Sequence, residues 1–266
     1  MKNSFFLLFI IFISFAFQRE KILERKDFKA FFDEYDVKGS FLLYDLKQNH
    51  YISYDTKRCR KGFLPASTFK IMNSMIALET GVTDTSTLLP WNGDQHWNEA
   101  WNKDMKLREA FHVSCVPCYQ EIARKIGLER MKHYIDITNY GNMDIRPETL
   151  DNFWLQGNSR ITQFEQIDIL RKLYHHQLPF SKENMMLFKQ IMIAEQTGAY
   201  TLRAKTGWAQ ADQQNTGWYV GYIETRDNIY FFATHIEKPI SPEGSGNFGA
   251  ARQIITKNIL KNLNII

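Results

Sequence analysis

Pro65-Ala66-Ser67-Thr68-Phe69-Lys70 places a serine three residues before a lysine, at the start of an apolar run that extends to Leu78. If the run is a helix, positions i and i+3 share a face, so the Ser67 hydroxyl and the Lys70 amine can meet. A serine hydroxyl becomes a good nucleophile only when a neighbouring base takes its proton. A lysine is such a base only when it is uncharged or chemically altered, and burial lowers its pKa in that direction. Because this spacing also arises by chance, the rest of the chain has to supply its context.

The composition is that of a globular protein with one large core or two lobes. The chain has 266 residues, of which 44% are hydrophobic and 23% charged. Its net charge of +4 comes from 33 basic and 29 acidic residues. No basic run is long enough to suggest a nucleic-acid partner.

The first residues have the pattern of an export signal. Lys2 precedes the apolar stretch 5–17, and Ser14-Phe15-Ala16 is a small-x-small cleavage site. We therefore expect a signal peptide over residues 1–16, a mature chain over 17–266 and a bacterial periplasmic location. An uncleaved membrane anchor is the alternative, although the run is short for a span and no later segment is apolar for long enough.

Three cysteines, Cys59, Cys115 and Cys118, leave at least one thiol free or paired with another molecule. Cys115-Val116-Pro117-Cys118 has the C-x-x-C form of a redox motif. No thioredoxin-like βαβ pattern surrounds it, so we favour a pair of small buried thiols. No second cysteine or histidine pair stands at ligand spacing, so we expect no metal site.

The order of the predicted elements indicates an α/β (α+β) fold built from both chain ends. Periodicity and turn residues predict strands over 39–45, 51–54, 199–206, 216–224 and 229–236. They predict helices over 27–35, 104–111, 117–126, 130–137, 181–194 and 248–263, and a capping box from Thr162 to Glu165 before another. We expect a single antiparallel sheet flanked by helices, formed by residues 24–64 and 195–266, with a helical lobe over 65–194 inserted into it. A cleft between the lobes is the expected place for a site.

Three further short motifs follow the serine and lysine. They are Ser114-Cys115-Val116, Tyr140-Gly141-Asn142 and Lys205-Thr206-Gly207. Each is weak alone, because Ser114 could cap a helix, Tyr140 could be a core aromatic and Lys205 a solvated charge. Their presence together, in this order, is far more specific than any one of them.

With these motifs the chain, from about Glu24 to its end, resembles the class D (oxacillin-hydrolysing) serine β-lactamases. The Tyr-Gly-Asn element favours class D, since class A enzymes have Ser-Asp-Asn in that place. Trp154-Leu155-Gln156-Gly157 resembles the class D loop that closes over the lysine. Cys115 and Cys118 occupy places where this family is more often aliphatic. The resemblance implies the β-lactamase/transpeptidase fold and hydrolysis of penicillin-type β-lactams.

The resemblance also implies a role for each matching residue. Ser67 attacks the lactam carbonyl, and Lys70 carries CO2 as a carbamate and acts as general base, with no other cofactor. Ser114 relays a proton to the leaving nitrogen. Val116 and Trp154 wall the lysine, and Trp154 can donate its indole N–H to the carbamate.

Other residues are expected to hold the substrate. The backbone N–H groups of Ser67 and Trp208 would form the oxyanion hole. Lys205, Thr206 and Arg252 would bind the substrate carboxylate, and Gly207 would leave the strand edge bare. The remaining candidate substrate contacts are Tyr140, Asn142 and Trp101.

Two other functions share these motifs. A β-lactam sensor domain is acylated and stays acylated, but it would normally follow membrane spans and a signalling domain. A D,D-peptidase acts on peptidoglycan stems, and the Tyr140 and Trp154 elements count against it. The motif set therefore favours a free hydrolase with a small-molecule β-lactam as its partner.

Overall fold

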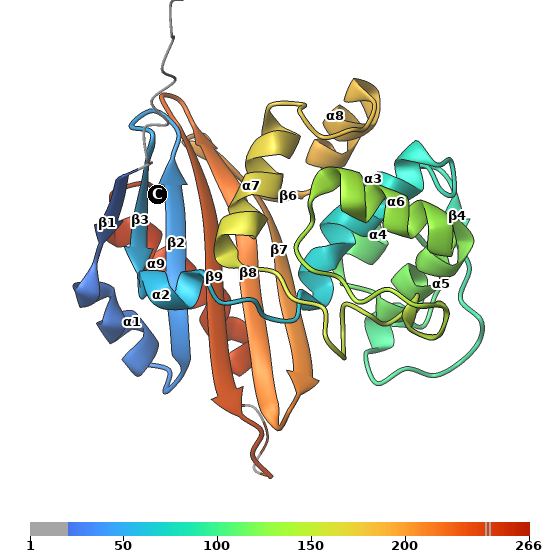
Figure 1. Ribbon diagram of the computed structural model, residues 1–266, viewed down its shortest axis with the longest axis horizontal. Coiled ribbons are helices and arrows are strands. Elements are labelled where there is room, and N and C mark those ends of the chain that lie inside the picture. Colours follow the sequence, from blue (N-terminus) through green and yellow to red (C-terminus); the bar gives the residue numbers. More distant parts are fainter. Residues whose placement is uncertain (1–20, 243, 245) are drawn as a thin grey trace, which may run out of the picture.

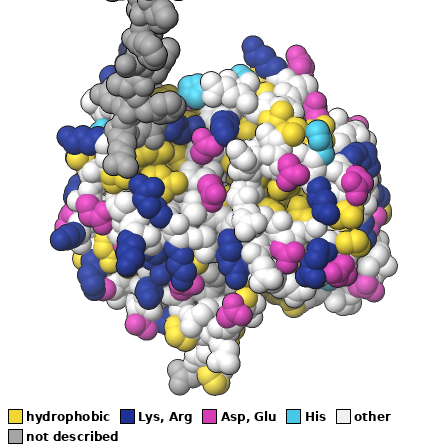
Figure 2. Space-filling model, viewed as in Figure 1, with side chains coloured by type: hydrophobic (Ala, Val, Ile, Leu, Met, Phe, Trp, Pro, Cys, Tyr) yellow, Lys and Arg dark blue, Asp and Glu magenta, His cyan; other side chains and the backbone are white. Residues whose placement is uncertain are grey.

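A computed structural model describes residues 21–242, 244 and 246–266. The predicted export signal over residues 1–16 lies outside this part of the chain. None of the helices formed by the described residues has the length and apolar character needed to cross a bilayer. Basic and acidic side chains are interspersed over the face shown in Figure 2.

The described residues form a seven-stranded sheet in the order β1-β3-β2-β9-β8-β7-β6. Strands from the two ends of the chain meet where β2 pairs antiparallel with β9, with Leu42 opposite Ala233. The strands are β1 (Lys21–Glu24), β2 (Lys38–Asp45), β3 (His50–Tyr54), β6 (Ile193–Gln196), β7 (Tyr200–Ala211), β8 (Gln214–Thr225) and β9 (Ile229–Pro239). The predicted sheet built from both chain ends is therefore confirmed.

The sheet is mixed, so the prediction of a purely antiparallel sheet was wrong at one edge. β1 runs parallel to β3, with Ile22 opposite Tyr51. The stretch Lys21–Glu24 lacks clear alternation of apolar and polar residues, and it is a strand because β3 offers it a partner. Such pairing between distant segments leaves little trace in local sequence.

Helices cover both faces of the sheet (Figure 1). α1 (Lys29–Asp33) and α9 (Phe248–Asn262) pack on one face over a core that includes Phe41 and Leu43 of β2. α7 (Gln163–Tyr174) packs on the opposite face against β9, β2 and β8, over a core that includes Leu42 and Tyr44. The period of two along β2 places these alternate side chains on opposite faces, each buried by its own helical layer.

Helices α3 (Lys70–Glu79), α4 (Leu107–His112), α5 (Val116–Ile126), α6 (Leu128–Thr138) and α8 (Lys182–Ile191) gather on the β7 side of the sheet (Figure 1). α2 (Thr56–Cys59) lies beside β2 and β3 instead. The short 3-10 helices are η1 (Lys26–Phe28), η2 (Ala66–Phe69), η3 (Glu99–Trp101) and η4 (Pro147–Thr149). A short ribbon of β4 (Leu88–Leu89) and β5 (Met105–Lys106) joins the helices on the β7 side. β5 replaces the start of the helix predicted over 104–111, because pairing with β4 holds its two residues extended.

Two other differences from the sequence prediction lie beside the site. The helix predicted over 181–194 ends at Ile191, and β6 follows because Ile193 pairs with Arg203 of β7. The strands predicted to end at 206 and begin at 216 extend to a two-residue turn at Asp212 and Gln213, both with positive φ. This hairpin tip is polar and carries no Asn-Gly signal, so the sequence predicts a loop where the two strands continue.

Candidate active site

Ser67 and Lys70 lie on the turn that begins α3. Ala66 has φ 50°, in the left-handed region, and its N–H donates to the Trp154 carbonyl at 2.8 Å. η2 then continues into α3, so Ser67 and Lys70 share one face, and Lys70 Nζ donates to Ser67 Oγ at 2.8 Å. A local i to i+3 contact of this kind is what the sequence predicted.

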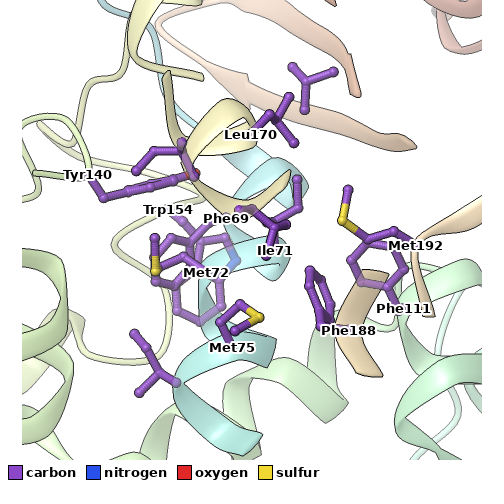
Figure 3. Packing of buried hydrophobic residues seen from close by; sticks show 14 of the residues in the cluster. Phe69, Ile71, Met72, Met75, Phe111, Tyr140, Trp154, Leu170, Phe188 and Met192 are labelled. Atoms are coloured by element: carbon purple, nitrogen blue, oxygen red, sulfur yellow. The ribbon is translucent and has the colours of Figure 1, made fainter. Parts of the chain in front are cut away.

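Lys70 is fully buried, and desolvation lowers the pKa of its amine to about 7. The ammonium lies 5.2 Å from the centre of the Tyr119 ring. The adjacent Phe69 ring stacks on Trp154 at 5.2 Å (Figure 3). Because these apolar walls exclude water, the neutral amine is populated near neutral pH, as a base requires.

Trp154 is fully buried, and its indole Nε1–H has no hydrogen-bond partner among the residues that the structure describes. A buried donor without an acceptor is costly, by about 1–3 kcal/mol. The Trp154 carbonyl accepts the hydrogen bond from the Ala66 N–H, which places Trp154 next to Ser67. The unpartnered indole N–H therefore lies beside the turn that carries Ser67 and Lys70, where it can donate to an anionic oxygen.

Ser114 faces Lys205 from the other side of the site. Ser114 follows α4 with φ 56°, another left-handed residue that is not glycine. Lys205 Nζ donates to Ser114 Oγ at 3.1 Å and to the Thr206 carbonyl at 3.1 Å. Burial, with the positive charges of Lys70 and Arg252 nearby, lowers the pKa of Lys205 well below its usual range. Backbone strain at both Ala66 and Ser114 is typical of functional sites.

The second half of β7 presents an open edge to this cluster. β6 pairs with β7 only as far as Arg203, and no other strand of the described residues pairs with β7 beyond it on that side. A Cβ at Gly207 would lie 3.1 Å from the Thr68 side chain and 3.2 Å from the Pro65 carbonyl. Glycine there lets β7 approach the Ser67 turn closely, which adds a packing reason to the bare edge expected from the sequence.

Arg252 reaches the same edge from α9. Its Nη1 donates to the Gly207 carbonyl at 2.9 Å, and its Nε has no partner among the described residues. Burial lowers the pKa of the guanidinium to about 10, so it remains charged at neutral pH. The side chain therefore keeps a free donor and a positive charge for an anionic ligand.

Ser67, Ser114 and Arg252 line one pocket of about 460 Å³. Seven of the predicted site residues line it: Ser67, Trp101, Ser114, Val116, Thr206, Trp208 and Arg252. The sequence analysis did not single out the other lining residues, which are Trp97, Asn98, Val113, Ala209 and Gln210. Trp97 is 85% exposed and packs edge-on against Trp101. The only feature of the sequence that indicated a pocket position for Trp97 is its place four residues before Trp101. A larger surface hollow, of about 780 Å³, contains residues of α1 and β9 and none of the motif residues.

Four of the residues predicted to contact the substrate are not among those that line this pocket: Tyr140, Asn142, Lys205 and Gly207. Tyr140 is buried behind Phe69, with ring centres 5.5 Å apart. The Asn142 N–H donates to the Arg160 carbonyl at 2.8 Å, and the Arg160 N–H donates back at 2.7 Å. The motif therefore supports the site from behind, because Tyr140 packs on Phe69 and Asn142 pairs with Arg160, which follows the Trp154 loop in the chain.

Cys115 and Cys118 form a disulfide, so the prediction of two free thiols was wrong. Cys115 caps the N-terminus of α5 and Cys118 lies one turn further, which brings the two sulfurs together. Cys59 is the free cysteine that the odd count required, and burial raises the pKa of its thiol.

Comparisons with known proteins agree with this geometry. Residues 35–261 match the family described as the penicillin binding protein transpeptidase domain. Beta-lactamase OXA-48 from Klebsiella pneumoniae is 42% identical over 244 residues, which are 91% of this chain and 90% of that protein. The class D β-lactamase YbXI from Nostoc has a TM-score of 0.86 at 42% identity, covering 91% of this chain and 100% of the other.

The C-terminal domain of the Bacillus licheniformis BlaR penicillin receptor is also similar, with a TM-score of 0.85 at 29% identity over 93% of this chain and 98% of that domain. The higher identity, however, is to proteins described as β-lactamases. The chain therefore belongs to the penicillin-binding protein transpeptidase family and, within it, to the class D β-lactamases, the enzymes that hydrolyse β-lactams.

Proposed function

We propose that this enzyme hydrolyses penicillin-type β-lactams through an acyl-enzyme on Ser67, with Lys70 as general base in its carboxylated form. The observation that carries the proposal is the 2.8 Å contact between Lys70 Nζ and Ser67 Oγ in a dry pocket. A base in hydrogen-bond contact with the nucleophile, and with a pKa near the working pH, is the arrangement that acyl transfer requires.

The surroundings of Lys70 fit a carbamate formed with CO2. Its lowered pKa leaves a neutral amine, the form that reacts with CO2. Bound there, CO2 would supply an anionic oxygen base. The unpartnered Trp154 Nε1–H is the donor that would hold it, and Val116 at the pocket wall would limit the entry of water. Ser67 Oγ lies 2.8 Å from Lys70 Nζ, close enough to transfer its proton to the base.

The other polar groups suit the substrate. Arg252 and Lys205 would bind its carboxylate with Thr206, which lines the pocket beside them. The Ser67 and Trp208 N–H groups would stabilise the charge that develops on the lactam oxygen. Ser114 Oγ, which accepts from Lys205 Nζ at 3.1 Å, would deliver the proton to the leaving nitrogen. Trp101 forms a side wall, its Nε1 fixed to the Val113 carbonyl at 3.0 Å.

A β-lactam receptor is the second candidate, because of the similarity to the BlaR penicillin-receptor domain. Hydrolysis of a chromogenic cephalosporin by the purified protein distinguishes the two functions. An enzyme should turn over many equivalents in bicarbonate buffer. If one equivalent is consumed and a stable Ser67 adduct remains in saturating bicarbonate, the receptor function replaces the hydrolase.

Arg252→Ala should raise KM about tenfold or more while lowering kcat little, because an ionic hydrogen bond that is made in both ground and transition states contributes uniform binding of about 1.5–3 kcal/mol. Steady-state kinetics with benzylpenicillin would measure both constants. Arg252→Lys is the matched control, which keeps the charge and should recover part of the KM. A large fall in kcat at unchanged KM would instead assign Arg252 to the transition state.

Trp154→Phe should slow deacylation about tenfold or more while leaving the packing on Phe69 in place, since it removes a hydrogen bond to a charged group worth about 1.5–3 kcal/mol. Mass spectrometry of quenched reactions should then find Ser67 acylated at steady state. Trp91→Phe, on an exposed loop where the indole donates to the Asp94 carbonyl, is the control. Equal deacylation rates for wild type and Trp154→Phe would show that the indole N–H has no part in the reaction.

We also propose that the enzyme is exported to the periplasm with removal of residues 1–16. The Cys115–Cys118 disulfide supports this location, because such bonds persist in oxidising compartments. The intact mass of protein recovered from the periplasm should lack about the first 16 residues. Recovery of the full-length mass from the membrane fraction would contradict cleavage.

A further inference from the structure

The Cys115–Cys118 disulfide lies between two residues of the active site. Ser114 precedes Cys115 and Val116 follows it, and both line the pocket. The Cys115 N–H donates to the Ala110 carbonyl at 2.9 Å, and Cys115 Sγ accepts from the Cys118 N–H at 3.2 Å. The bond therefore fastens the first turn of α5 to the segment that carries Ser114.

Ser114 needs such support, because its backbone is in an unfavourable conformation. At φ 56° the Cβ of Ser114 crowds the backbone, so this conformation is less favourable than the right-handed region. The Ser114 N–H donates to the Phe111 carbonyl at 3.2 Å, which restrains it on its N-terminal side. On its C-terminal side, the disulfide at Cys115 is the covalent restraint.

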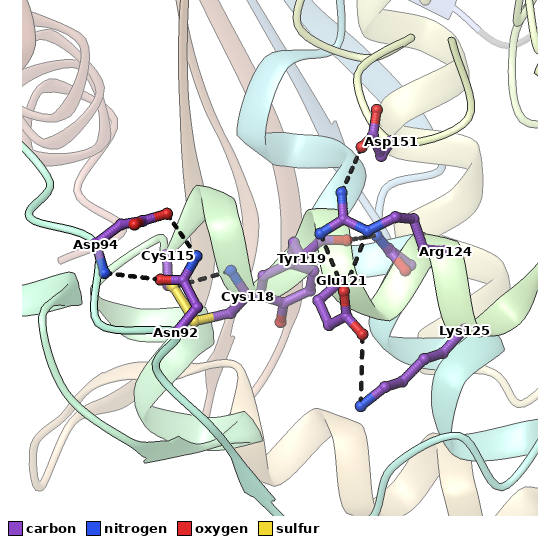
Figure 4. Close-up of polar contacts among 10 residues, drawn as sticks. Asn92, Asp94, Cys115, Cys118, Tyr119, Glu121, Arg124, Lys125 and Asp151 are labelled. Atoms are coloured by element: carbon purple, nitrogen blue, oxygen red, sulfur yellow. Dashed lines mark hydrogen bonds and ion pairs between the residues drawn. A yellow bond between two sulfur atoms is a disulfide. The ribbon is translucent and has the colours of Figure 1, made fainter. Parts of the chain in front are cut away.

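The two sulfurs differ in their access to solvent. Cys115 is fully buried, whereas Cys118 is half-buried and lines a hollow of about 330 Å³. Figure 4 shows Asn92 beside the disulfide and Arg124 further along the same helix. This hollow shares Trp101 with the substrate pocket, but Cys118 does not line that pocket. A small thiol can therefore approach Cys118 without entering the β-lactam site.

We propose that Cys115–Cys118 is a reducible bridge whose oxidised form positions Ser114, so that the rate of acylation depends on its redox state. The inference rests on the proposed role of Ser114 as the proton donor to the leaving nitrogen. The bridge is a positioning element, since neither sulfur lines the substrate pocket.

The reductant is a small dithiol, and the exchange balances within the pair. One thiolate of the dithiol attacks Cys118 Sγ, the S–S bond breaks, and Cys115 leaves as a thiolate. The N-terminus of α5, where Cys115 Sγ accepts the Cys118 N–H, stabilises that anion. The second thiolate of the dithiol then attacks the dithiol sulfur that is bonded to Cys118 Sγ. Cys118 leaves as a thiolate. The protein gains two electrons and two protons as two thiols, and the dithiol becomes a cyclic disulfide.

The test compares oxidised and reduced forms of the mature wild-type enzyme. Dithiothreitol would reduce the folded protein and then be removed anaerobically by gel filtration. Alkylation after unfolding should label Cys59 alone in the oxidised form and all three cysteines in the reduced form. We expect the reduced enzyme to acylate about tenfold more slowly, less than the ~100-fold that a 1 Å displacement can cost. Its deacylation rate should be unchanged, and reoxidation should restore acylation.

The double variant Cys115→Val/Cys118→Val is the matched control, because it has no disulfide to reduce. Its acylation and deacylation rates should be the same with and without dithiothreitol treatment. If the reduced enzyme acylates as fast as the oxidised one and differs only by a lower melting temperature, the disulfide only stabilises the fold and the inference fails. It also fails if dithiothreitol leaves the bridge intact in the folded protein. Turnover by the oxidised enzyme is measured first, so a failure of the proposed function is seen separately.

Discussion

We expect Ser67→Ala to lose at least about four orders of magnitude in kcat, because Ser67 Oγ is the nucleophile in contact with the base and removal of a catalytic nucleophile costs up to about 10⁶ elsewhere. Pre-incubation with penicillin, followed by intact-mass analysis, should find no covalent adduct. The variant should still bind penicillin, since Arg252 and Lys205 remain in place.

Loss of activity by misfolding is excluded by two measurements. The Ser67→Ala variant removes a single hydrogen bond, worth about 1 kcal/mol, so its melting temperature should stay close to that of the wild type. Ser86→Ala, at an exposed serine on a loop, controls for serine replacement and should keep wild-type kinetics. A covalent adduct at the same site in the Ser67→Ala protein would falsify the assignment.

Lys70→Met should likewise abolish turnover, because methionine fills much of the same volume and has no group that accepts a proton. Its melting temperature at neutral pH should exceed that of the wild type. Burial disfavours the ammonium, and the lowered pKa of Lys70 is the measure of that cost. Calorimetry with kinetics on the same preparation would check both results.

The pH dependence follows from the same lowered pKa. Between the folded pKa of about 7 and the usual lysine pKa of 10.5, the unfolded chain binds more protons at Lys70 than the folded chain does. The contribution of Lys70 to the free energy of unfolding therefore rises with pH across this window, and its cost is fully present below pH 7. Lys70→Met should remove this rise.

Activity should depend on pH and bicarbonate together. At pH 6 only about a tenth of a group with pKa 7 is neutral, so the form that reacts with CO2 becomes scarce as pH falls. Added bicarbonate should therefore raise kcat most at acidic pH, and ¹³C-labelled bicarbonate should give a carbamate signal that Lys70→Met lacks. Activity that is independent of bicarbonate throughout would show that the bare neutral amine is the base.

Local geometry explains what could be predicted well. The Ser67–Lys70 contact spans three residues, so a single helical turn specifies it. The strands β8 and β9 carry their own aromatic and β-branched signals, β2 carries aromatic and leucine residues, and the capping box from Thr162 to Glu165 forms as expected. Conversely, β1 and β6 are short, and their extended conformation depends on pairing with β3 and β7, respectively.

The sequence by itself determined the family, the order of the motifs and the pairing of nucleophile with lysine, because each depends on residue identity or on spacing within one turn. Tertiary structure alone decided the pKa of Lys70, since the walls that desolvate it come from separate segments. It also decided the contact between Ser114 and Lys205, 91 positions apart, and placed Tyr140 behind the site instead of in it. Burial and long-range contact depend on how distant segments pack, and no local pattern encodes that.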